Sequence, residues 1–219
     1  LNGIGVKISQ GCTDIVLSDV IVNDCTAGAV LAVGTPAQPI NGVSFIGCEC
    51  VTSGTCANPF VAGFYAENVY NIYGQNSHFS RNNGGAGLGF GICCIGCSTL
   101  DFSECRISNN TGAAAVGVYF DGVFDARFDK CTLLRNGTSS SSNSSFGYGI
   151  LIDNSQSVMA LNSTLAASYA ITGTAANLRS RNSSNIGLLN CMSIAATGNH
   201  YAAGFDLSDG SACAIINSI

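Results

Sequence analysis

The stretch CSTLDFSECRISNN, residues 97–110, and the stretch VFDARFDKCTLLRN, residues 123–136, decide the fold of this chain. Each alternates apolar and polar residues as a half-buried strand does, then reaches a cysteine and ends on an asparagine at the same offset. Two stretches with one pattern indicate an internal repeat.

The first apolar residue of this strand recurs with a period of about 28 residues. The positions that carry it are Ile15, Val43, Ile72, Leu100, Ala126, Val158, Ile186 and Ala214. Glycine or asparagine, which tolerate left-handed turns, stands a few residues before most of them. The longest interval contains the Ser-rich segment 137–146, which we expect to be an inserted loop.

Each period contains about three short strands separated by tight turns, and no segment shows the periodicity of an amphipathic helix. A unit of this length is too short for a strand, a helix and a returning strand. Strands that stack on their equivalents one period later would rise by ~4.8 Å per coil. We therefore expect an all-β fold, a right-handed parallel β-helix of about eight coils with three strands each, as one domain over residues 1–219.

With these columns, the sequence resembles the right-handed parallel β-helix of the pectate-lyase-like superfamily, in the form of generic parallel β-helix repeats. The resemblance covers nearly the whole chain and implies the fold without implying a function. A narrower similarity is the stretch FSRNNGGAG, residues 79–87, which resembles the FxxN and GGA motifs of chlamydial polymorphic membrane proteins, a family of surface adhesins.

Enzymes of the superfamily often cleave polysaccharides in an outer groove, and the resemblance makes that activity an alternative here. Pectate lyases use an Asp-rich calcium site with Arg and Lys, and polygalacturonases use NTD, DD, GHG and RIK motifs. None of these motifs occurs in the sequence. The family's catalytic residues therefore cannot be carried over to this chain.

The composition excludes several classes of partner. Only 10% of the residues are charged, and the net charge of −5 includes just 8 Lys and Arg, which argues against a nucleic-acid interface. No apolar run approaches the ~18 residues of a membrane-spanning helix. No motif indicates a cofactor or a metal ion. With 47% hydrophobic residues, part of the outer surface is either covered by another chain or is a neutral Ser/Asn/Gly surface.

Several columns of the repeat predict structural roles. The asparagines Asn82, Asn110 and Asn136 fall at one turn of successive coils and are expected to form a hydrogen-bonded ladder. One inward column contains Cys48, Cys105, Cys131 and Cys191. Since serine, valine and isoleucine fill the same column elsewhere, we expect these thiols to act as small core residues.

The cysteines also leave other interpretations open, as metal ligands or as disulfide partners. In CCIGC, residues 93–97, strand alternation points Cys93 outward and Cys94 inward, which argues against a metal or redox motif. Cys105 and Cys131 lie one rung apart, within reach of a disulfide, although parallel side chains suit its torsion poorly. Cys25 and Cys56 fall in turns and are the favoured candidates for oxidation.

One column contains the candidates for acid–base chemistry. Asp121 and Asp153 are expected on consecutive rungs, with Asp125 nearby in sequence. Glycoside hydrolysis needs two carboxylates ~5–9.5 Å apart, which this pair would satisfy. The alternative, which we favour, is that these are acidic residues at a turn, with Arg181 between Asp153 and Asp209 in a surface charge ladder.

Two further pairs of charges share outward columns on adjacent coils. They are Asp101 with Arg127, and Glu104 with Lys130. We expect both to be cross-rung ion pairs, each contributing ~0.2–1 kcal/mol.

Exposed aromatic residues are expected in two outward columns, one with Tyr65 and Tyr119 and the other with Tyr70 and Phe124. Rings on a flat sheet can stack on sugars or pack against a neighbouring chain. We favour the interface, because charge is so scarce on this chain.

Together these patterns favour a non-enzymatic structural or adhesive module of a fibre, cell surface or virion appendage. Because the sequence shows no cap at either end, we expect a segment of a longer protein or a subunit that meets other chains. Its partners would be copies of itself, as a trimer or filament, and glycans outside the cell. The alternative function is a polysaccharide lyase or glycoside hydrolase acting on surface glycans.

The cysteine column predicts that Cys105→Ser leaves the fold intact, because Ser77 and Ser163 occupy equivalent positions. Circular dichroism and urea unfolding of the purified variant measure this. Loss of the folded state on this single change would show that the thiol has a role other than filling the column.

Overall fold

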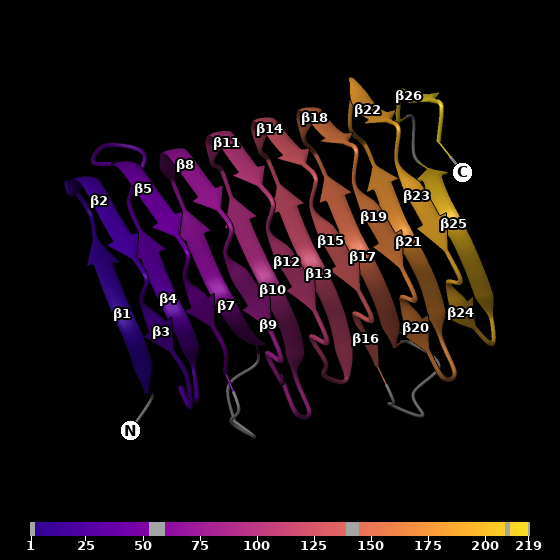
Figure 1. Ribbon diagram of the computed structural model, residues 1–219, viewed down its shortest axis with the longest axis horizontal. Coiled ribbons are helices and arrows are strands. Elements are labelled where there is room, and N and C mark those ends of the chain that lie inside the picture. Colours follow the sequence, from indigo (N-terminus) through magenta and orange to yellow (C-terminus); the bar gives the residue numbers. More distant parts are fainter. Residues whose placement is uncertain (1–2, 53–59, 139–144, 209–210, 219) are drawn as a thin grey trace.

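The computed structural model describes residues 3–52, 60–138, 145–208 and 211–218. These residues form strands and turns without a helix, and they wind into a right-handed parallel β-helix of about seven coils with three main sheets. Figure 1 shows the coils side by side along the long axis, from indigo to yellow, with the two termini at opposite ends. The predicted fold class is confirmed.

Two sheets of eight parallel strands run the length of the molecule. Sheet A consists of β1 (Ile4–Ser9), β4 (Gly28–Val33), β7 (Phe60–Glu67), β10 (Leu88–Ile95), β13 (Ala114–Asp121), β17 (Phe146–Asp153), β21 (Thr174–Arg181) and β25 (Tyr201–Ser208). Sheet B consists of β2 (Thr13–Ser18), β5 (Ile40–Ile46), β8 (Val69–Gln75), β11 (Ser98–Ser103), β14 (Phe124–Asp129), β18 (Gln156–Leu161), β22 (Ile186–Leu189) and β26 (Cys213–Ile216).

The third side of each coil is shorter. Sheet C consists of β3 (Ile21–Val22), β6 (Glu49–Cys50), β9 (His78–Ser80), β12 (Arg106–Ser108), β15 (Thr132–Leu134), β19 (Thr164–Ala166) and β23 (Met192–Ile194). A small fourth sheet, which the repeat did not predict, consists of β16 (Gly137–Thr138), β20 (Tyr169–Ala170) and β24 (Thr197–Gly198). The segment 137–146 is therefore strand at Gly137–Thr138 and again from Phe146, and residues 139–144 lie outside the described residues.

The register follows the predicted column of apolar residues through most of the molecule. Ile72 pairs with Leu100, and Leu100 pairs with Ala126. The last position was predicted wrongly, because Ile186 pairs with Cys213 rather than Ala214. The final coil is one residue shorter than the coil before it. The residue is lost between β24 and β25, because Ala170 pairs with Gly198 but Thr174 pairs with Tyr201.

The interior is a continuous apolar core with stacked aromatic rings. The largest fully buried side chains include Phe45, Phe64, Phe79, Phe102, Phe120 and Phe128. The rings of Phe102 and Phe128, one coil apart, stack with centroids 5.4 Å apart. Burying a phenylalanine contributes ~1.5–3 kcal/mol, so the phenylalanine column of Phe102 and Phe128 ties these two coils to one another.

Each coil bends at residues in the left-handed backbone conformation, and these residues form columns. At the bend before sheet B the column contains Gly11, Asn68, Gly96, Gly122, Asn154 and Asn182. A second column, at the start of the sheet B strands, contains Asp14, Gly42, Asn71, Thr99, Asp125, Ser157 and Asn185. Only glycine, asparagine and aspartate adopt this conformation routinely, which explains the glycine and asparagine columns of the sequence.

The cysteine and serine columns stabilise the bends through hydrogen bonds. The Cys105 thiol donates to the Ser103 carbonyl at 3.3 Å, and the Ser163 hydroxyl donates to the Leu161 carbonyl at 2.7 Å. The Ser163 hydroxyl also accepts the backbone N–H of Cys131 from the preceding coil at 3.1 Å. These thiols are buried, as expected of core residues, but they also satisfy a carbonyl two residues back, which the sequence interpretation missed.

All cysteines in the described part of the chain are free thiols, including Cys105, Cys131 and Cys25. Cys25 lies at a bend and is half-buried, with its thiol 3.4 Å from the Asn23 carbonyl. Its predicted partner, Cys56, lies outside the described residues, so that pairing stays a prediction.

An asparagine ladder runs through the interior at the bend after sheet C. The Asn82 side-chain amide donates to Asn110 at 2.8 Å, and the Asn110 amide donates to Asn136 at 2.8 Å. All three side chains are fully buried. In the next coil Ser168 takes the equivalent place, and its backbone N–H is satisfied instead by the Asn177 side chain of β21.

Thr99 is a β-branched residue held at a φ of 57°, in a column where Asn71 and Asn185 stand in other coils. Because asparagine tolerates this conformation better, we expect Thr99→Asn to raise the free energy of unfolding by about 1 kcal/mol. Urea unfolding measures the change. The matched control is Thr132→Asn in β15, outside the left-handed columns, which should give no gain; equal effects at both sites would contradict the explanation.

Candidate functional site

Sheet A has a second apolar cluster on its outer face, separate from the core inside the coils. The buried members of this outer patch are Ala62, Phe90, Cys93, Val116, Tyr148, Leu151 and Ala176. They come from β7, β10, β13, β17 and β21, and they pack against one another across adjacent coils. As strand alternation predicts, Cys93 lies in this outer patch while Cys94 lies in the inner core.

Two tyrosines flank the rung of Cys93. Tyr65, Cys93 and Tyr119 are register partners on β7, β10 and β13, so the repeat places this column correctly. Each phenol bonds a carboxylate of its own strand, Tyr65 to Glu67 at 3.1 Å and Tyr119 to Asp121 at 3.5 Å. Burial, followed by the nearby carboxylates, raises the pKa of both phenols.

An apolar depression opens between these two rings. We call it the tyrosine hollow. It has a volume of about 190 Å³ and is lined by Tyr65, Leu88, Phe90, Cys93, Ile95 and Tyr119. Phe90 stacks on Tyr119 with ring centroids 5.8 Å apart. Burial raises the pKa of the Cys93 thiol at its floor, so this cysteine is a neutral apolar group rather than a nucleophile.

The carboxylates proposed for acid–base chemistry are close together, and both already have partners. Asp121 and Asp153 are register partners on β13 and β17. Asp153 is buried and accepts two bonds from the Arg181 guanidinium, one of them at 2.6 Å. Asp121 accepts the Asn154 amide at 2.9 Å. The Arg181–Asp153 pair is part of the predicted charge ladder, and Asp209, its other predicted member, lies outside the described residues.

Asp125, the third candidate, lies away from this pair. It sits in β14 of sheet B at a φ of 61°, and its side chain is exposed. It belongs to the column of left-handed residues that contains Asn71 and Ser157 in other coils. An aspartate there suits the bend, and the structure does not bring it into a site with the carboxylates of sheet A.

Sequence reasoning missed a polar network at the C-terminal end of the outer patch. The Arg179 guanidinium donates to the Tyr148 hydroxyl at 2.7 Å and lies over its ring, 5.5 Å from the centroid. It also pairs with Asp206 at 3.3 Å. The signal that could have revealed it is strand alternation, because Arg179 stands two residues before Arg181 and therefore on the same outer face.

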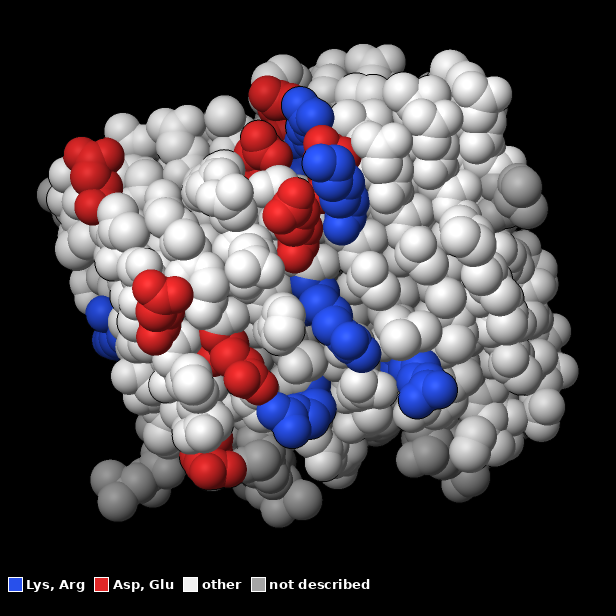
Figure 2. Space-filling model, viewed as in Figure 1, with Lys and Arg blue, Asp and Glu red and all other residues white. Residues whose placement is uncertain are grey.

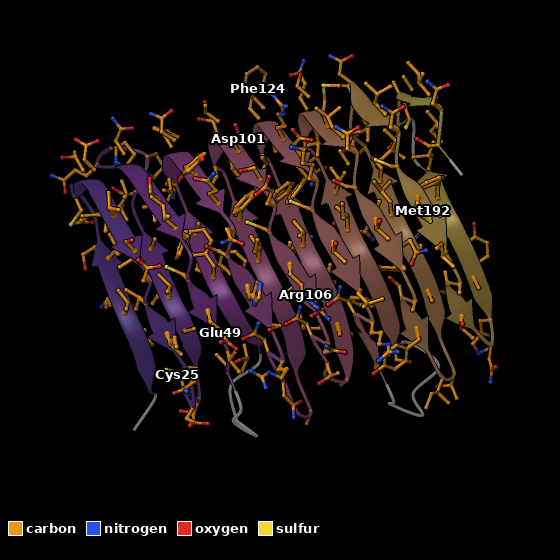
Figure 3. The ribbon with its side chains drawn as sticks, in the orientation of Figure 1. Cys25, Glu49, Asp101, Arg106, Phe124 and Met192 are labelled. Carbon is orange, nitrogen blue, oxygen red and sulfur yellow. The ribbon has the colours of Figure 1, made fainter. Side chains whose placement is uncertain are left out.

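The second aromatic column has the same spacing as the first. Tyr70 and Phe124 both pair with Ser98 on sheet B, so the two rings are separated by a full coil. Phe124 is 53% exposed, and Tyr70 is half-buried. Figure 3 shows Phe124 projecting from the edge of the molecule near Asp101.

Only one of the two expected cross-rung ion pairs is present. Lys130 and Glu104 approach to 3.7 Å. Asp101 and Arg127 are register partners as expected, but the Arg127 guanidinium bonds Asp129 of its own strand at 3.1 Å. Asp129 lies on the same face two residues away, so it competes with Asp101 for the Arg127 guanidinium. The predicted Asp101–Arg127 ion pair was therefore wrong.

Charge is distributed unevenly over the outer surface. After Arg135, the charged residues are Asp153, Arg179, Arg181, Asp206 and Asp209. The first four belong to sheet A, and the last lies outside the described residues. Strands β18, β19, β22, β23 and β26 of sheets B and C therefore carry no charged side chain. Figure 2 shows this as a white C-terminal half beside charged N-terminal and central coils.

We call the outer side of these five strands the uncharged face. One column of sheet C changes from charged to apolar residues along the molecule. Glu49 and Arg106 occupy it in earlier coils, and Met192 occupies it in the last coil of the sheet, as Figure 3 shows. Met192 is 45% exposed and its neighbour Ile194 is 47% exposed. On sheet B, Met159 borders a hollow of about 360 Å³ whose lining includes Gly187 and Ala214.

The described residues contain no group of three or more His, Cys, Asp or Glu side chains arranged to hold a metal ion. Within the same ranges, no helix is long and apolar enough to cross a membrane.

No family model and no curated protein matches the chain. Among solved structures it is similar to tailspike protein 2 from Escherichia coli O157:H7 bacteriophage CAB120, with a TM-score of 0.42 and 11% identity over 96% of this chain and 38% of that one. It is also similar to the periplasmic alginate epimerase AlgG, with a TM-score of 0.37 and 11% identity over 97% of this chain and 72% of that one. The chain thus spans well under half of the tailspike's length.

Removing the Arg181 guanidinium leaves a buried Asp153 carboxylate unpaired. We expect Arg181→Gln to lower the free energy of unfolding by about 2 kcal/mol, and addition of Asp153→Asn to recover part of that loss. The matched control is Arg127→Gln, which breaks a more exposed pair and should cost no more than ~0.5 kcal/mol. Equal costs at the two arginines in urea unfolding would contradict this account.

Proposed function

We propose that this chain is a structural and adhesive β-helix module of a fibre, cell surface or virion appendage, and that it assembles laterally with copies of itself. The observation that carries the proposal is the uncharged face on sheets B and C of the C-terminal coils. A soluble monomer seldom leaves a broad face without charge and with large apolar side chains exposed. Such a face suits an interface core, from which charged residues are depleted.

The exposed side chains of this face support the same proposal. Met159, Met192 and Ile194 are each more than 40% exposed, with values of 43%, 45% and 47%. Methionine is enriched at interfaces, because its flexible thioether adapts to a partner surface. The hollow beside Met159 offers a recess that side chains of a neighbouring copy would fill.

The state of the carboxylates favours a structural role over glycan cleavage. A glycosidase needs one carboxyl group that can donate a proton and a second that is free to attack or activate water. Asp153 is instead bound by Arg181, and Asp121 by Asn154 and Tyr119. These bonds fix the register of adjacent coils and occupy the oxygens that catalysis would use.

Contact with glycans is the adhesive part of the proposal. The Phe124 ring is 53% exposed on sheet B, and an exposed aromatic ring can stack on the apolar face of a sugar. This contact would act beside the assembly interface rather than replace it, because Phe124 precedes the uncharged strands.

Oligomeric state tests the proposal. We expect light scattering to show oligomers of the wild-type chain, and Met159→Lys combined with Met192→Lys to weaken assembly by about tenfold or more, because lysines would be buried at the interface. The control is Val16→Lys combined with Ile21→Lys, which alters exposed residues of the same two columns at the N-terminal end and should leave assembly unchanged.

A monomer at all concentrations, together with release of reducing or unsaturated sugars from a polysaccharide panel, would overturn the proposal. Loss of that sugar release on Asp121→Asn or Asp153→Asn would assign the chain to the lyase or hydrolase class instead.

A further inference from the structure

We propose that the tyrosine hollow on the outer face of sheet A binds a methylated ammonium group, such as the head group of choline. The site lies on a different sheet from the uncharged face, and its ligand chemistry is independent of assembly. The inference rests on the aromatic rings, the apolar lining and the charges at the rim.

Three aromatic side chains, Tyr65, Phe90 and Tyr119, line the hollow and suit it to a cation. Tyr65 and Tyr119 are both register partners of Cys93, so they are two rungs, or ~9.6 Å, apart. The side chains of both tyrosines line the hollow, so a small cation in it would lie beside aromatic rings, which attract cations. Phe90, which stacks on Tyr119, provides a third aromatic wall.

The apolar lining favours a methylated ammonium ion over a strongly hydrated cation or a sugar. Leu88, Cys93 and Ile95 complete the hollow, and Cys93 at its floor is a neutral thiol. A sugar would leave its hydroxyls facing these groups without hydrogen-bond partners, which is costly. The methyl groups of a quaternary ammonium ion need no such partners, and they spread its charge over an apolar surface.

The charges at the rim have the sign that such a ligand requires. Glu67 and Asp121 each accept the phenol of the adjacent tyrosine, which places one carboxylate beside each ring. Because the pKa of each phenol is raised, both hydroxyls stay protonated and keep donating to the carboxylates. Arg181, the nearby cation on β21, is bound to Asp153.

The size of the hollow agrees with a head group rather than a polymer. Its volume of about 190 Å³ is below the ~300–1,000 Å³ of a typical drug-sized site, so it would hold one small group. The remainder of the ligand, whether free choline, a choline ester or a lipid, would extend away from the sheet.

Titration with choline chloride, followed by NMR shifts or calorimetry, tests the proposal. We expect millimolar binding of choline and binding about tenfold weaker for 3,3-dimethyl-1-butanol, its neutral carbon isostere, because only the cation is attracted to the rings. Equal binding of the two compounds, or no saturable binding of choline, would overturn the proposal. Saturable binding of neutral mono- or disaccharides in place of choline would also overturn it.

Substitutions locate the site. Tyr119→Leu should weaken choline binding about tenfold, while Tyr119→Phe, which keeps the ring, should retain most of it. Asp121→Asn, which preserves shape and removes charge, should weaken binding about threefold. Tyr73→Leu, on sheet B, is the control and should change nothing. Circular dichroism verifies folding of each variant, and binding that survives Tyr119→Leu in a folded protein would contradict the assignment.

Two further measurements separate this inference from its alternatives. Phosphatidylcholine vesicles compared with free choline distinguish a lipid source from a soluble one, and binding of either supports the site. Met159→Lys combined with Met192→Lys should leave choline binding unchanged, so failure of assembly and failure of the cation site are distinguishable.

Discussion

Parallel stacking of each coil on the preceding one is the constraint on which the rest of the structure depends. A residue in this fold has its important neighbours about one period away in sequence, because backbone hydrogen bonds join equivalent strands of adjacent coils. A side chain in a strand therefore lies beside the side chains of its register partners one rung above and below. The phenylalanine column, the asparagine ladder and the Asp153–Arg181 pair are all products of this one rule.

The bends impose the complementary constraint on the sequence. Many of the turns are made where the backbone enters the left-handed region, and this happens at the same places in successive coils. Glycine and asparagine occupy many of those places, and a serine or cysteine often follows to satisfy a carbonyl of the bend. The scarcity of charge has a related cause, because a column of like charges one rung apart would repel itself.

Much of this could be predicted from the sequence, because the period identifies columns and the columns identify neighbours. The pairing of Leu100 with Ala126 and of Asp121 with Asp153 follows from counting alone. Counting cannot decide between competing partners on one face, which is why Arg127 bonds Asp129 rather than Asp101. It also fails where one coil loses a residue, as at Cys213. The tyrosine hollow could not be predicted either, because its position depends on how side chains pack in three dimensions, and the repeat pattern does not give that packing.

The hydrogen bonds between coils run along the long axis of the molecule, and this has a mechanical consequence. Tension applied at the two ends would load all the bonds of one inter-coil boundary together, while successive boundaries would bear the same load in series. Yielding would then begin at the weakest boundary. The interior asparagine ladder reinforces the boundaries from Thr52 to Asn136 and stops at Ser168, so the boundaries beyond its two ends would open first under axial load.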